Sequence, residues 1–261
     1  MILTDTHTHL YLKEFGEDRD DVMKRALDQD VRYMIMPNID SSSIDDLHTL
    51  CDHYPSHCFP MMGLHPGSVD QHYQEELEKI GSLFKKRTYY AVGEIGIDLY
   101  WDKTYKEQQK QAFRTQIEWA KDMQLPIVIH ARDSFETIFE VLDDVNSDKL
   151  RGVFHCFTGT AEQAEKALSY GGFWLGIGGV LTFKNSKLDK VIEEVDMENL
   201  ILETDSPYLA PAPNRGKRNE SSYIRLVADK LAAIKGLTTE QVAEITTANA
   251  EKLFKIPVKW S

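Results

Sequence analysis

Two histidines near the start of the chain are spaced so that both could bind the same metal ion. His7 and His9 end a short segment that begins at Ile2 with strand propensity. In a strand, residues two apart point to the same side, so the two imidazoles would project together. Neutral imidazoles are common ligands of divalent transition metals. A lone His-x-His pair is a weak signal, so its meaning depends on whether more ligands follow.

More candidate ligands follow later segments that we predict to be strands. They are His65, Glu94, His130, His155, Glu203 and Asp205. If the strands are parallel and form a barrel, their carboxyl ends share one face, where barrel enzymes build their active sites. Glu94 stands in an apolar, glycine-flanked segment, where a carboxylate is costly to bury without a cation or hydrogen-bond donors. The histidines and carboxylates on one rim therefore predict a metal centre.

Short apolar segments alternate with helical ones along the chain. Besides the segment at the start, the predicted strands are residues 31–36, 58–64, 89–95, 126–130, 152–155, 172–176 and 200–203. The predicted helices are residues 18–29, 41–54, 73–86, 106–123, 134–145, 161–170, 188–195, 222–234 and 239–254. Strict alternation over this length fits an α/β fold, either a (β/α)8 TIM barrel or a doubly wound sheet. The strand count and the shared rim favour the barrel, as a single domain over residues 1–261 with an extra C-terminal helix.

Composition narrows the class of protein. The net charge of −12 argues against broad, charge-driven binding to nucleic acid, but it allows a local basic rim around an acidic metal site. No apolar run reaches the roughly 18 residues of a membrane span, and the first residues do not resemble a signal peptide. Cys51, Cys58 and Cys156 form no CxxC pair and predict reduced thiols. We expect a cytoplasmic protein with no membrane contact and no obligate protein partner.

The number of candidate ligands exceeds what one catalytic zinc takes from a protein, and it suits two divalent ions that share a carboxylate. The ligands are His7, His9, Glu94, His130, His155 and Asp205. Glu94 is the natural bridge, because its strand is central among those that carry ligands. His7, His9 and Asp205 would complete one site, and His130 and His155 the other. Carboxylates suit Mg²⁺ or Mn²⁺ whereas histidines favour Zn²⁺, so the sequence leaves the metal open.

Two residues near these ligands are candidates for catalysis beside the bridging Glu94. Asp205 could take the proton from the attacking water. We assign His65 to the substrate, as an acid or transition-state donor, because the other residues already account for two ions. No GxSxG nucleophile motif and no P-loop occurs in the sequence. The glycines at 176, 178 and 179 are a weak phosphate-loop signal and predict a tight turn instead.

Basic residues near the predicted rim are candidate contacts for phosphate. Arg132 follows the fifth predicted strand, and Arg215, Lys217 and Arg218 crowd a loop after the eighth. In an acidic protein, a basic cluster beside a metal site is what a polyanionic substrate needs. Solvated loop charges are the alternative. Aromatic residues near strand ends could stack bases, although packing is their commoner role; these are Tyr100, Trp101, Phe157 and Tyr208.

A series of motifs in this chain resembles those of the TatD family of metal-dependent DNases. In order, they are residues 5–10 (DTHTHL), 63–66 (GLHP), 93–98 (GEIGID), 130–133 (HARD), 155–159 (HCFTG), 202–209 (LETDSPYL), 215–219 (RGKRN) and 247–254 (TANAEKLF). The resemblance implies an amidohydrolase-like TIM barrel, a binuclear metal site and hydrolysis of DNA phosphodiesters. Every ligand position of the family is filled here. Ser221 and Ser222 depart from the expected proline at a helix start, away from the ligands.

Two enzyme functions and one other function compete. The leading hypothesis is a metal-dependent deoxyribonuclease that works from the end of single-stranded or damaged DNA. The alternative is a hydrolase of a small ester, lactone or amide, since barrels with the same ligands catalyse different hydrolyses. A non-catalytic metal-binding or interaction protein is the least favoured, because the intact set of ligands argues for catalysis. The sequence does not decide the natural substrate.

Overall fold

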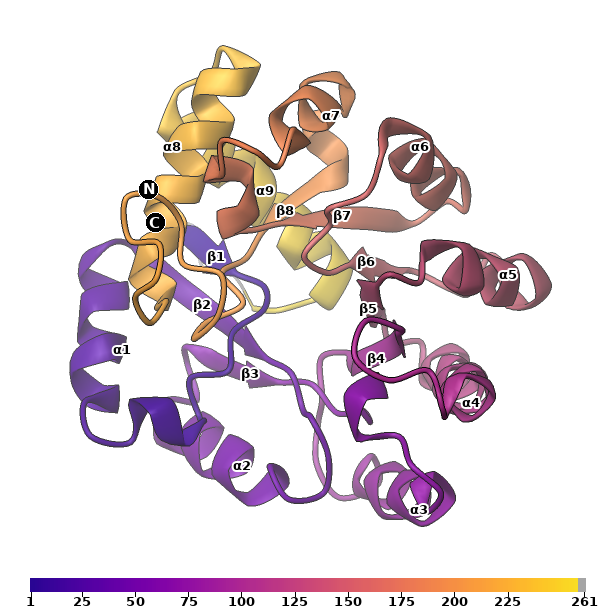
Figure 1. Cartoon of the computed structure of the whole chain (residues 1–261). Coiled ribbons are helices and arrows are strands. Elements are labelled where there is room, and N and C mark those ends of the chain that lie inside the picture. Colours follow the sequence, from indigo (N-terminus) through magenta and orange to yellow (C-terminus); the bar gives the residue numbers. More distant parts are fainter. Residues whose placement is uncertain (258–261) are drawn as a thin grey trace.

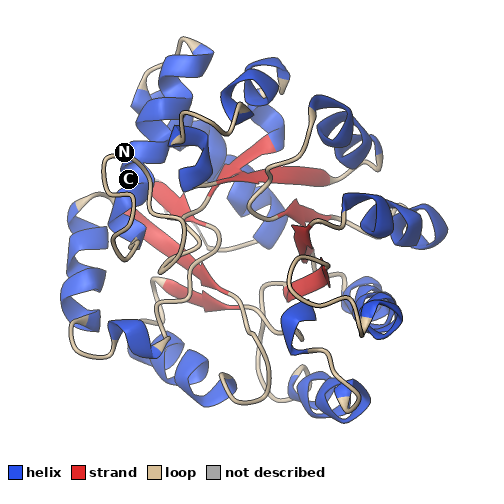
Figure 2. Cartoon of the chain, viewed as in Figure 1, coloured by secondary structure: helices blue, strands red, loops and turns tan. Residues whose placement is uncertain are grey.

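The computed structural model describes residues 1–257 as a ring of parallel strands with helices around it (Figures 1 and 2). The strands are β1 Leu3–Asp5, β2 Val31–Met36, β3 Cys58–Pro60, β4 Val92–Asp98, β5 Ile127–Arg132, β6 Gly152–Phe154, β7 Phe173–Ile177 and β8 Leu200–Leu202. The α-helices are α1 Arg19–Asp28, α2 Ile44–His53, α3 Tyr73–Leu83, α4 Lys106–Met123, α5 Phe135–Val145, α6 Ala161–Ser169, α7 Leu188–Glu194, α8 Ile224–Lys235 and α9 Thr239–Phe254. Each strand is followed by the helix of the same number, and α9 is the extra C-terminal helix that the sequence predicted.

Hydrogen bonds at two seams close the ring. β1–β3 form one sheet and β4–β8 form another, with neighbours in chain order. Between β3 and β4, the amide of Gly93 donates to the carbonyl of Met62 at 3.0 Å. Between β1 and β8, the amide of Thr6 donates to the carbonyl of Leu202 at 3.0 Å. The predicted TIM barrel is therefore confirmed, and the doubly wound sheet is excluded.

One strand boundary differs from the prediction in a way that matters for the site. β4 begins at Val92 and runs through Asp98, three residues beyond the predicted 89–95. It extends because β5 continues beside it, with Gly96 paired to His130 and Asp98 paired to Arg132. Polar residues near the end of β4, such as Asp98, are therefore part of the paired strand and not of the loop that follows it.

The first strand shows the opposite difference. β1 ends at Asp5, so His7 and His9 lie in the segment that follows it and not within a strand. This segment still runs alongside the loop after β8, through a bridge between Thr8 and Ser206. The two imidazoles are held together by this loop pairing and not by the alternation of a strand.

The amino end of the barrel is sealed by α9, which lies behind the strands in Figure 1. Thr238 begins this helix with a capping box that Gln241 completes. Because neighbouring apolar residues of the helix face the strands, they bury one continuous cluster. Its members are Tyr33, Ile35, Phe59, Met61, Ala91, Val128, Val153, Trp174 and Ile201, with Ala250, Leu253, Phe254 and Ile256 from the C-terminal region.

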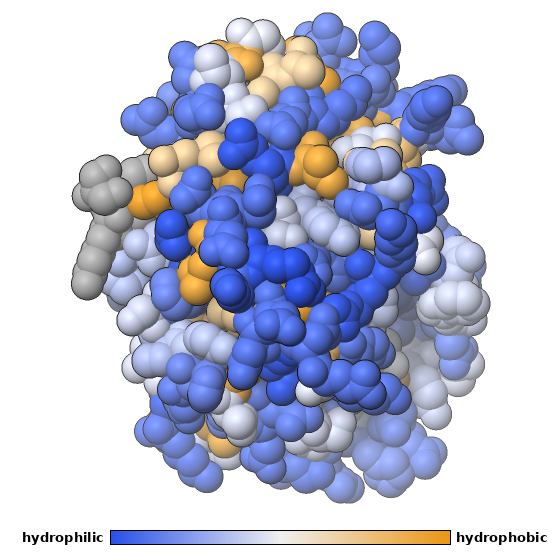
Figure 3. Space-filling model, turned by 90° about the vertical axis from the view of Figure 1, so that its left-hand side faces the viewer, coloured by the Kyte–Doolittle hydropathy of each residue, from blue (hydrophilic) through white to orange (hydrophobic). Residues whose placement is uncertain are grey.

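The outer surface of the barrel is mostly polar. Figure 3 shows the side around α1, where hydrophilic residues dominate and hydrophobic ones are scattered. Within residues 1–257, no helix is both long enough and apolar enough to cross a membrane.

Candidate metal centre

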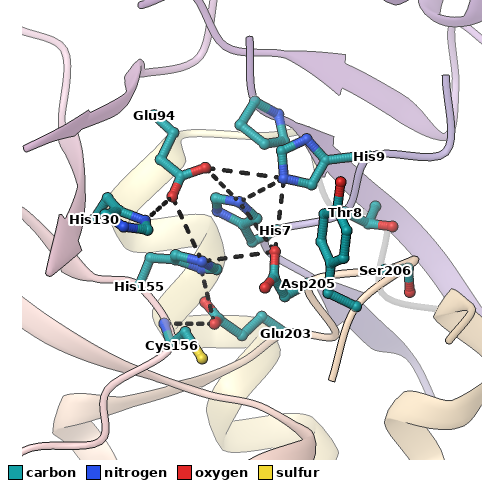
Figure 4. A network of polar contacts seen from close by, with 12 residues as sticks. His7, Thr8, His9, Glu94, His130, His155, Cys156, Glu203, Asp205 and Ser206 are labelled. Carbon is teal, nitrogen blue, oxygen red and sulfur yellow. Dashed lines mark hydrogen bonds and ion pairs between the residues drawn. The ribbon is translucent and has the colours of Figure 1, made fainter. Parts of the chain in front are cut away.

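Side chains from five strand regions meet at the carboxyl end of the barrel (Figure 4). They include every ligand that the sequence predicted: His7, His9, Glu94, His130, His155 and Asp205. His7, His9, Glu94 and His155 are buried, whereas His130 and Asp205 keep partial access to solvent. The structure thus gathers residues that are up to 198 positions apart in the chain, since 205 − 7 = 198.

The two carboxylate oxygens of Glu94 face different pairs of histidines. Its Oε2 lies 3.2 Å from Nε2 of His7 and 3.9 Å from Nε2 of His9. Its Oε1 lies 2.7 Å from Nδ1 of His130 and 3.7 Å from Nε2 of His155. A carboxylate placed in this way can offer one oxygen to each of two neighbouring cations.

Asp205 faces the same space from the loop after β8. Its Oδ1 lies 3.8 Å from Nε2 of His7, 3.6 Å from Nε2 of His9 and 3.7 Å from Nε2 of His155. The backbone fixes this position, because the amide of Asp205 donates to the carbonyl of His7 at 2.9 Å. Asp205 also has a φ of 57°, in the left-handed region that is uncommon for residues with a side chain. Its carboxylate therefore lies between both histidine groups.

The ring nitrogens that point away from the centre have partners that set the tautomers. Tyr11 Oη donates to the carbonyl of Pro37 at 2.7 Å, so it accepts from Nδ1 of His9 at 3.1 Å. Nε2 of His130 lies 2.9 Å from Oδ2 of Asp98, which is an acceptor when ionised. In both histidines the outer nitrogen can hold a proton that points to its partner, so that the inner nitrogen would be free to bind a metal ion in place of a proton. This is the usual pattern of histidines that bind metal.

His155 and His7 differ from these two histidines, because Nδ1 of neither ring has a hydrogen-bond partner among the described residues, although that of His155 lies within ion-pair distance of a carboxylate. Nδ1 of His155 lies 2.9 Å from Oε1 of Glu203, which accepts from the amide of Cys156 at 2.6 Å. The ring of His7 is stacked on that of His155, with centroids 3.4 Å apart.

His65 shows the reverse arrangement. The amide of Gly67 donates to Nδ1 of His65 at 2.9 Å, so that nitrogen carries no proton. The neutral ring then carries its proton on Nε2, which faces Oε1 of Glu94 at 3.6 Å. Burial lowers the pKa of His65 to about 4, which keeps the ring neutral near pH 7. Although His65, Glu94 and His130 lie close enough to hold a metal ion, a protonated Nε2 favours a donor over a ligand.

The electrostatics of the centre fit bound cations. Burial raises the pKa of Glu94, but the surrounding histidines outweigh it and hold this pKa well below its usual value. Burial lowers the pKa of His130, yet Asp98 and Glu94 raise it to about 9. Burial likewise lowers the pKa of His155, while Glu203 and Glu94 raise it to about 10. The carboxylates thus attract positive charge, and the set of imidazole and carboxylate donors suits divalent metals.

A buried carboxylate connects the two loops that carry ligands. Asp5 accepts from the amide of Thr204 at 2.9 Å and from its hydroxyl at 2.7 Å. The same side chain accepts from the amide of His7 at 3.4 Å. Asp5 therefore holds the segment after β1 against the segment after β8, next to Asp205. Sequence reasoning had placed Asp5 in a motif without giving it this role.

The glycine at 176 is explained by close packing and not by phosphate binding. A Cβ at Gly176 would lie 2.2 Å from Oε2 of Glu203, so only glycine leaves room for that carboxylate. Gly176 lies within β7, which agrees with the strand predicted over residues 172–176 and not with the turn predicted from the glycines. Sequence reasoning identified Glu203 as a rim residue but did not predict that it supports His155. The feature of the sequence that pointed to Glu203 was its position directly after the segment that forms β8.

A cavity of about 840 Å³ opens above the centre. Its lining includes His9, Glu94, Asp98, His130, His155 and Asp205 of the centre, and also His65, Arg132, Trp101 and Tyr208. Of the four predicted phosphate contacts, only Arg132 lines this cavity. Its guanidinium lies 3.9 Å from the ring centroid of Tyr100.

The loop after β8 uses its basic residues in different ways. Arg218 donates to both carboxylate oxygens of Asp18, at 2.8 and 2.7 Å, so it ties the loop to the start of α1. Arg215 is exposed and lies 3.7 Å from the ring centroid of Phe183. Lys217 is exposed as well. The structure therefore does not bring these three cations to the lining of the cavity.

Comparison with known proteins decides the family. A family model described as TatD related DNase matches residues 4–255. The chain is also 39% identical over 256 residues to the metal-dependent hydrolase YabD of Bacillus subtilis, which covers 98% of this chain and 100% of YabD. The chain belongs to the TatD family. As a TatD protein it is a metal-dependent hydrolase, and the resemblance drawn from its motifs is confirmed.

Two further TatD proteins match over almost the whole chain. The 3'-5' ssDNA/RNA exonuclease TatD of Citrobacter rodentium is 32% identical over 262 residues, which covers 98% of each chain. The crystal structure of YjjV, a TatD homolog from Escherichia coli K12, matches with a TM-score of 0.91 at 28% identity and covers 98% of each chain.

Proposed function

We propose that this TatD protein is a deoxyribonuclease that holds two divalent metal ions and hydrolyses DNA phosphodiesters with an activated water. One observation carries the proposal: the two oxygens of Glu94 face two separate pairs of histidines. A single ion would engage one side of that carboxylate and leave the other pair of histidines without a role. The proposed ligands are His7, His9 and Asp205 for one ion and His130 and His155 for the other, with Glu94 shared.

The surrounding residues would divide the remaining tasks. When bound, the ions would lower the pKa of the attacking water and offset the charge on the phosphate. The carboxylate of Asp205, which is partly exposed to the cavity, would accept the proton of that water. His65 would donate from Nε2 to a phosphate oxygen, since its Nδ1 is occupied by Gly67. Arg132 would pair with the phosphate from the cavity wall.

We further propose that the enzyme removes nucleotides from the end of single-stranded or damaged DNA, in the 3′ to 5′ direction. The support is the similarity over nearly the whole chain to a protein named as a 3'-5' ssDNA/RNA exonuclease. The metal ions themselves are expected to be Mg²⁺, Mn²⁺ or Zn²⁺, because both hard and borderline donors are present.

A direct assay tests this function. The purified protein is incubated with 5′-labelled single-stranded DNA and with Mg²⁺, Mn²⁺ or Zn²⁺, and parallel samples contain excess chelator. We expect a ladder of products that shorten one nucleotide at a time, and no products with chelator. A small carboxylate ester and a lactone are tested alongside. Turnover of the ester or lactone with DNA left intact would instead support the small-molecule hydrolase.

A further inference from the structure

Exposed apolar side chains gather at the mouth of the barrel. Among residues 1–257, the large hydrophobic side chains that remain exposed are Met1, Tyr100, Trp101, Tyr208 and Leu209. All except Met1 lie in the loops after β4 and β8. Trp101, Tyr208 and Leu209 line the cavity above the proposed metal centre, and exposed apolar residues around a groove are typical of ligand-binding sites.

The loop after β4 holds an aromatic ring that is open to solvent. Trp101 is 79% exposed, and its indole meets the ring of Tyr100 edge-on, with centroids 4.7 Å apart. Tyr100 is fixed in turn, because its amide donates to Oδ1 of Asp98 at 3.0 Å and Arg132 lies over its ring. Asp98 therefore contacts both Tyr100, against which the exposed indole of Trp101 packs, and the proposed ligand His130.

The loop after β8 presents a second aromatic ring. Tyr208 is 49% exposed, and its ring lies edge-on to His9 with centroids 6.2 Å apart. The side chain of Asn219 donates to the carbonyl of Tyr208 at 2.7 Å and to that of Thr204 at 2.8 Å, which fixes the loop. In a ring of eight strands, β4 and β8 stand opposite each other. The two exposed rings therefore lie on opposite sides of the proposed metal centre.

We propose that Trp101 and Tyr208 are base-stacking sites for the nucleotides on either side of the scissile phosphate. This inference rests on the proposed nuclease function and specifies how the substrate is recognised. Every base has a flat face, so stacking accepts any sequence. Bases of an intact duplex are already stacked on their neighbours, so these sites select strands whose bases are unpaired.

Charge gives an independent reason for such sites. The protein carries a net charge of −12, so its overall field repels a polyanion. Among residues 1–257, Arg132 is the only arginine or lysine that lines the cavity, and Arg218 is paired with Asp18. Arginine and lysine side chains therefore offer few contacts to phosphates away from the metal centre, and aromatic contacts with the bases would supply affinity there. A protein partner on the same aromatic surface would cover the cavity and block the centre.

The test compares two 5′-labelled oligonucleotides of equal length and charge. One is all thymidine, and the other replaces the last two 3′ nucleotides with abasic tetrahydrofuran units. For the parent enzyme and its variants, kcat/KM for the first cleavage is measured on both, and metal content is checked for each protein. The variants are Trp101→Ala, Trp101→Phe and Tyr208→Ala. The matched control is Trp119→Ala, because Trp119 lines a separate groove between α3 and α4.

We expect the parent to prefer the base-bearing strand by on the order of 10-fold or more, the range for one or two stacked bases. Trp101→Ala and Tyr208→Ala should each lose most of that preference, Trp101→Phe should keep most of it, and Trp119→Ala should match the parent. A parent without preference, or a Trp101→Ala variant that slows both strands equally, would overturn the stacking sites while nuclease activity stands. A parent that cleaves neither strand would overturn the nuclease function itself, and the stacking sites with it.

Discussion

The two ends of the barrel are built from different kinds of contact. At the amino end, Leu253 and Phe254 of α9 pack against apolar side chains inside the ring. At the carboxyl end, buried histidines and carboxylates contact one another, and the backbone of Asp205 and Cys156 has positive φ values of 57° and 45°. Positive φ values also occur at the amino end, at Asp30, Gln124 and Lys255, so the difference between the ends is the burial of ionisable side chains, which costs free energy unless they are paired. The packing at the amino end therefore raises the free energy of unfolding, whereas the arrangement at the carboxyl end lowers it.

The same comparison explains how each end keeps its shape. The amino end needs only buried area and close packing, so many apolar residues could serve there. The carboxyl end needs particular atoms at particular places, as in the bonds from Thr204 to Asp5 and from Asn219 to the carbonyl of Thr204. Substitutions at the two ends should therefore separate stability from metal binding and catalysis.

The largest expected effect on stability is at the amino end. Phe254→Ala removes a side chain that is 2% exposed and leaves a cavity beneath the barrel. The free energy of unfolding should fall by about 3–5 kcal/mol. Denaturant unfolding measures this change, and metal content of the folded variant should stay at the parent level. Loss of metal at unchanged stability would contradict the separation of the two ends.

At the carboxyl end, His65→Ala should reduce turnover without loss of metal. Since Nε2 of His65 is the proposed donor to phosphate, kcat should fall by about 10²-fold. Elemental analysis should find the parent metal content. His72→Ala is the control, because that side chain is 61% exposed. If His65→Ala loses a metal equivalent, His65 is a ligand and its assignment as a donor is wrong.

A smaller effect is expected where a residue supports a ligand without binding metal itself. Glu203→Gln keeps the volume beside Gly176 but removes the charge next to His155. Metal affinity should fall about 10-fold or more, as for other groups that orient metal-binding histidines. Metal titration followed by activity and by thermal shift measures this affinity. The control is Glu140→Gln, whose side chain is 58% exposed and paired with Lys110; equal affinities in both variants would remove Glu203 from this role.

The smallest effect concerns the basic loop after β8. Arg215 and Lys217 are exposed, so replacing both with alanine should weaken DNA cleavage modestly and reduce its log–log salt slope by up to about one unit per lost phosphate contact. Hydrolysis of a small uncharged ester, where it occurs, should not change. Arg218→Ala serves as the contrast, because Arg218 is paired with Asp18 and should alter stability more than the salt slope. An unchanged salt slope in the double variant would exclude a phosphate contact for the loop.

Much of the fold and the whole set of candidate ligands could be predicted from the sequence. Alternation of apolar and amphipathic segments reports directly on buried parallel strands and their covering helices, so the barrel followed. Because all strand ends of a barrel share one face, polar residues at those ends predicted the centre. The structure brings Glu94 together with these side chains, although it lies inside β4 and not at its end.

The remaining features depend on contacts between distant segments, which a single sequence does not reveal. The tautomers of His9 and His65 are set by Pro37, through Tyr11, and by Gly67. The pairing of Arg218 with Asp18 joins positions 200 residues apart, so the sequence could not show that the charge of Arg218 is already paired with a carboxylate. Phe157, predicted as a possible stacking residue, is only 1% exposed and packs in the core.

The central claim is that Glu94 bridges two metal ions, and counting metal ions tests it most directly. The parent, Glu94→Gln and the control Glu75→Gln, whose side chain is 73% exposed, are loaded with metal, freed of excess ions and measured by elemental analysis. We predict two equivalents per chain in the parent and the control. Glu94→Gln should fall well below that value, because an amide has one neutral oxygen and bridges cations poorly. One equivalent in the parent, or two retained in Glu94→Gln, would contradict the account.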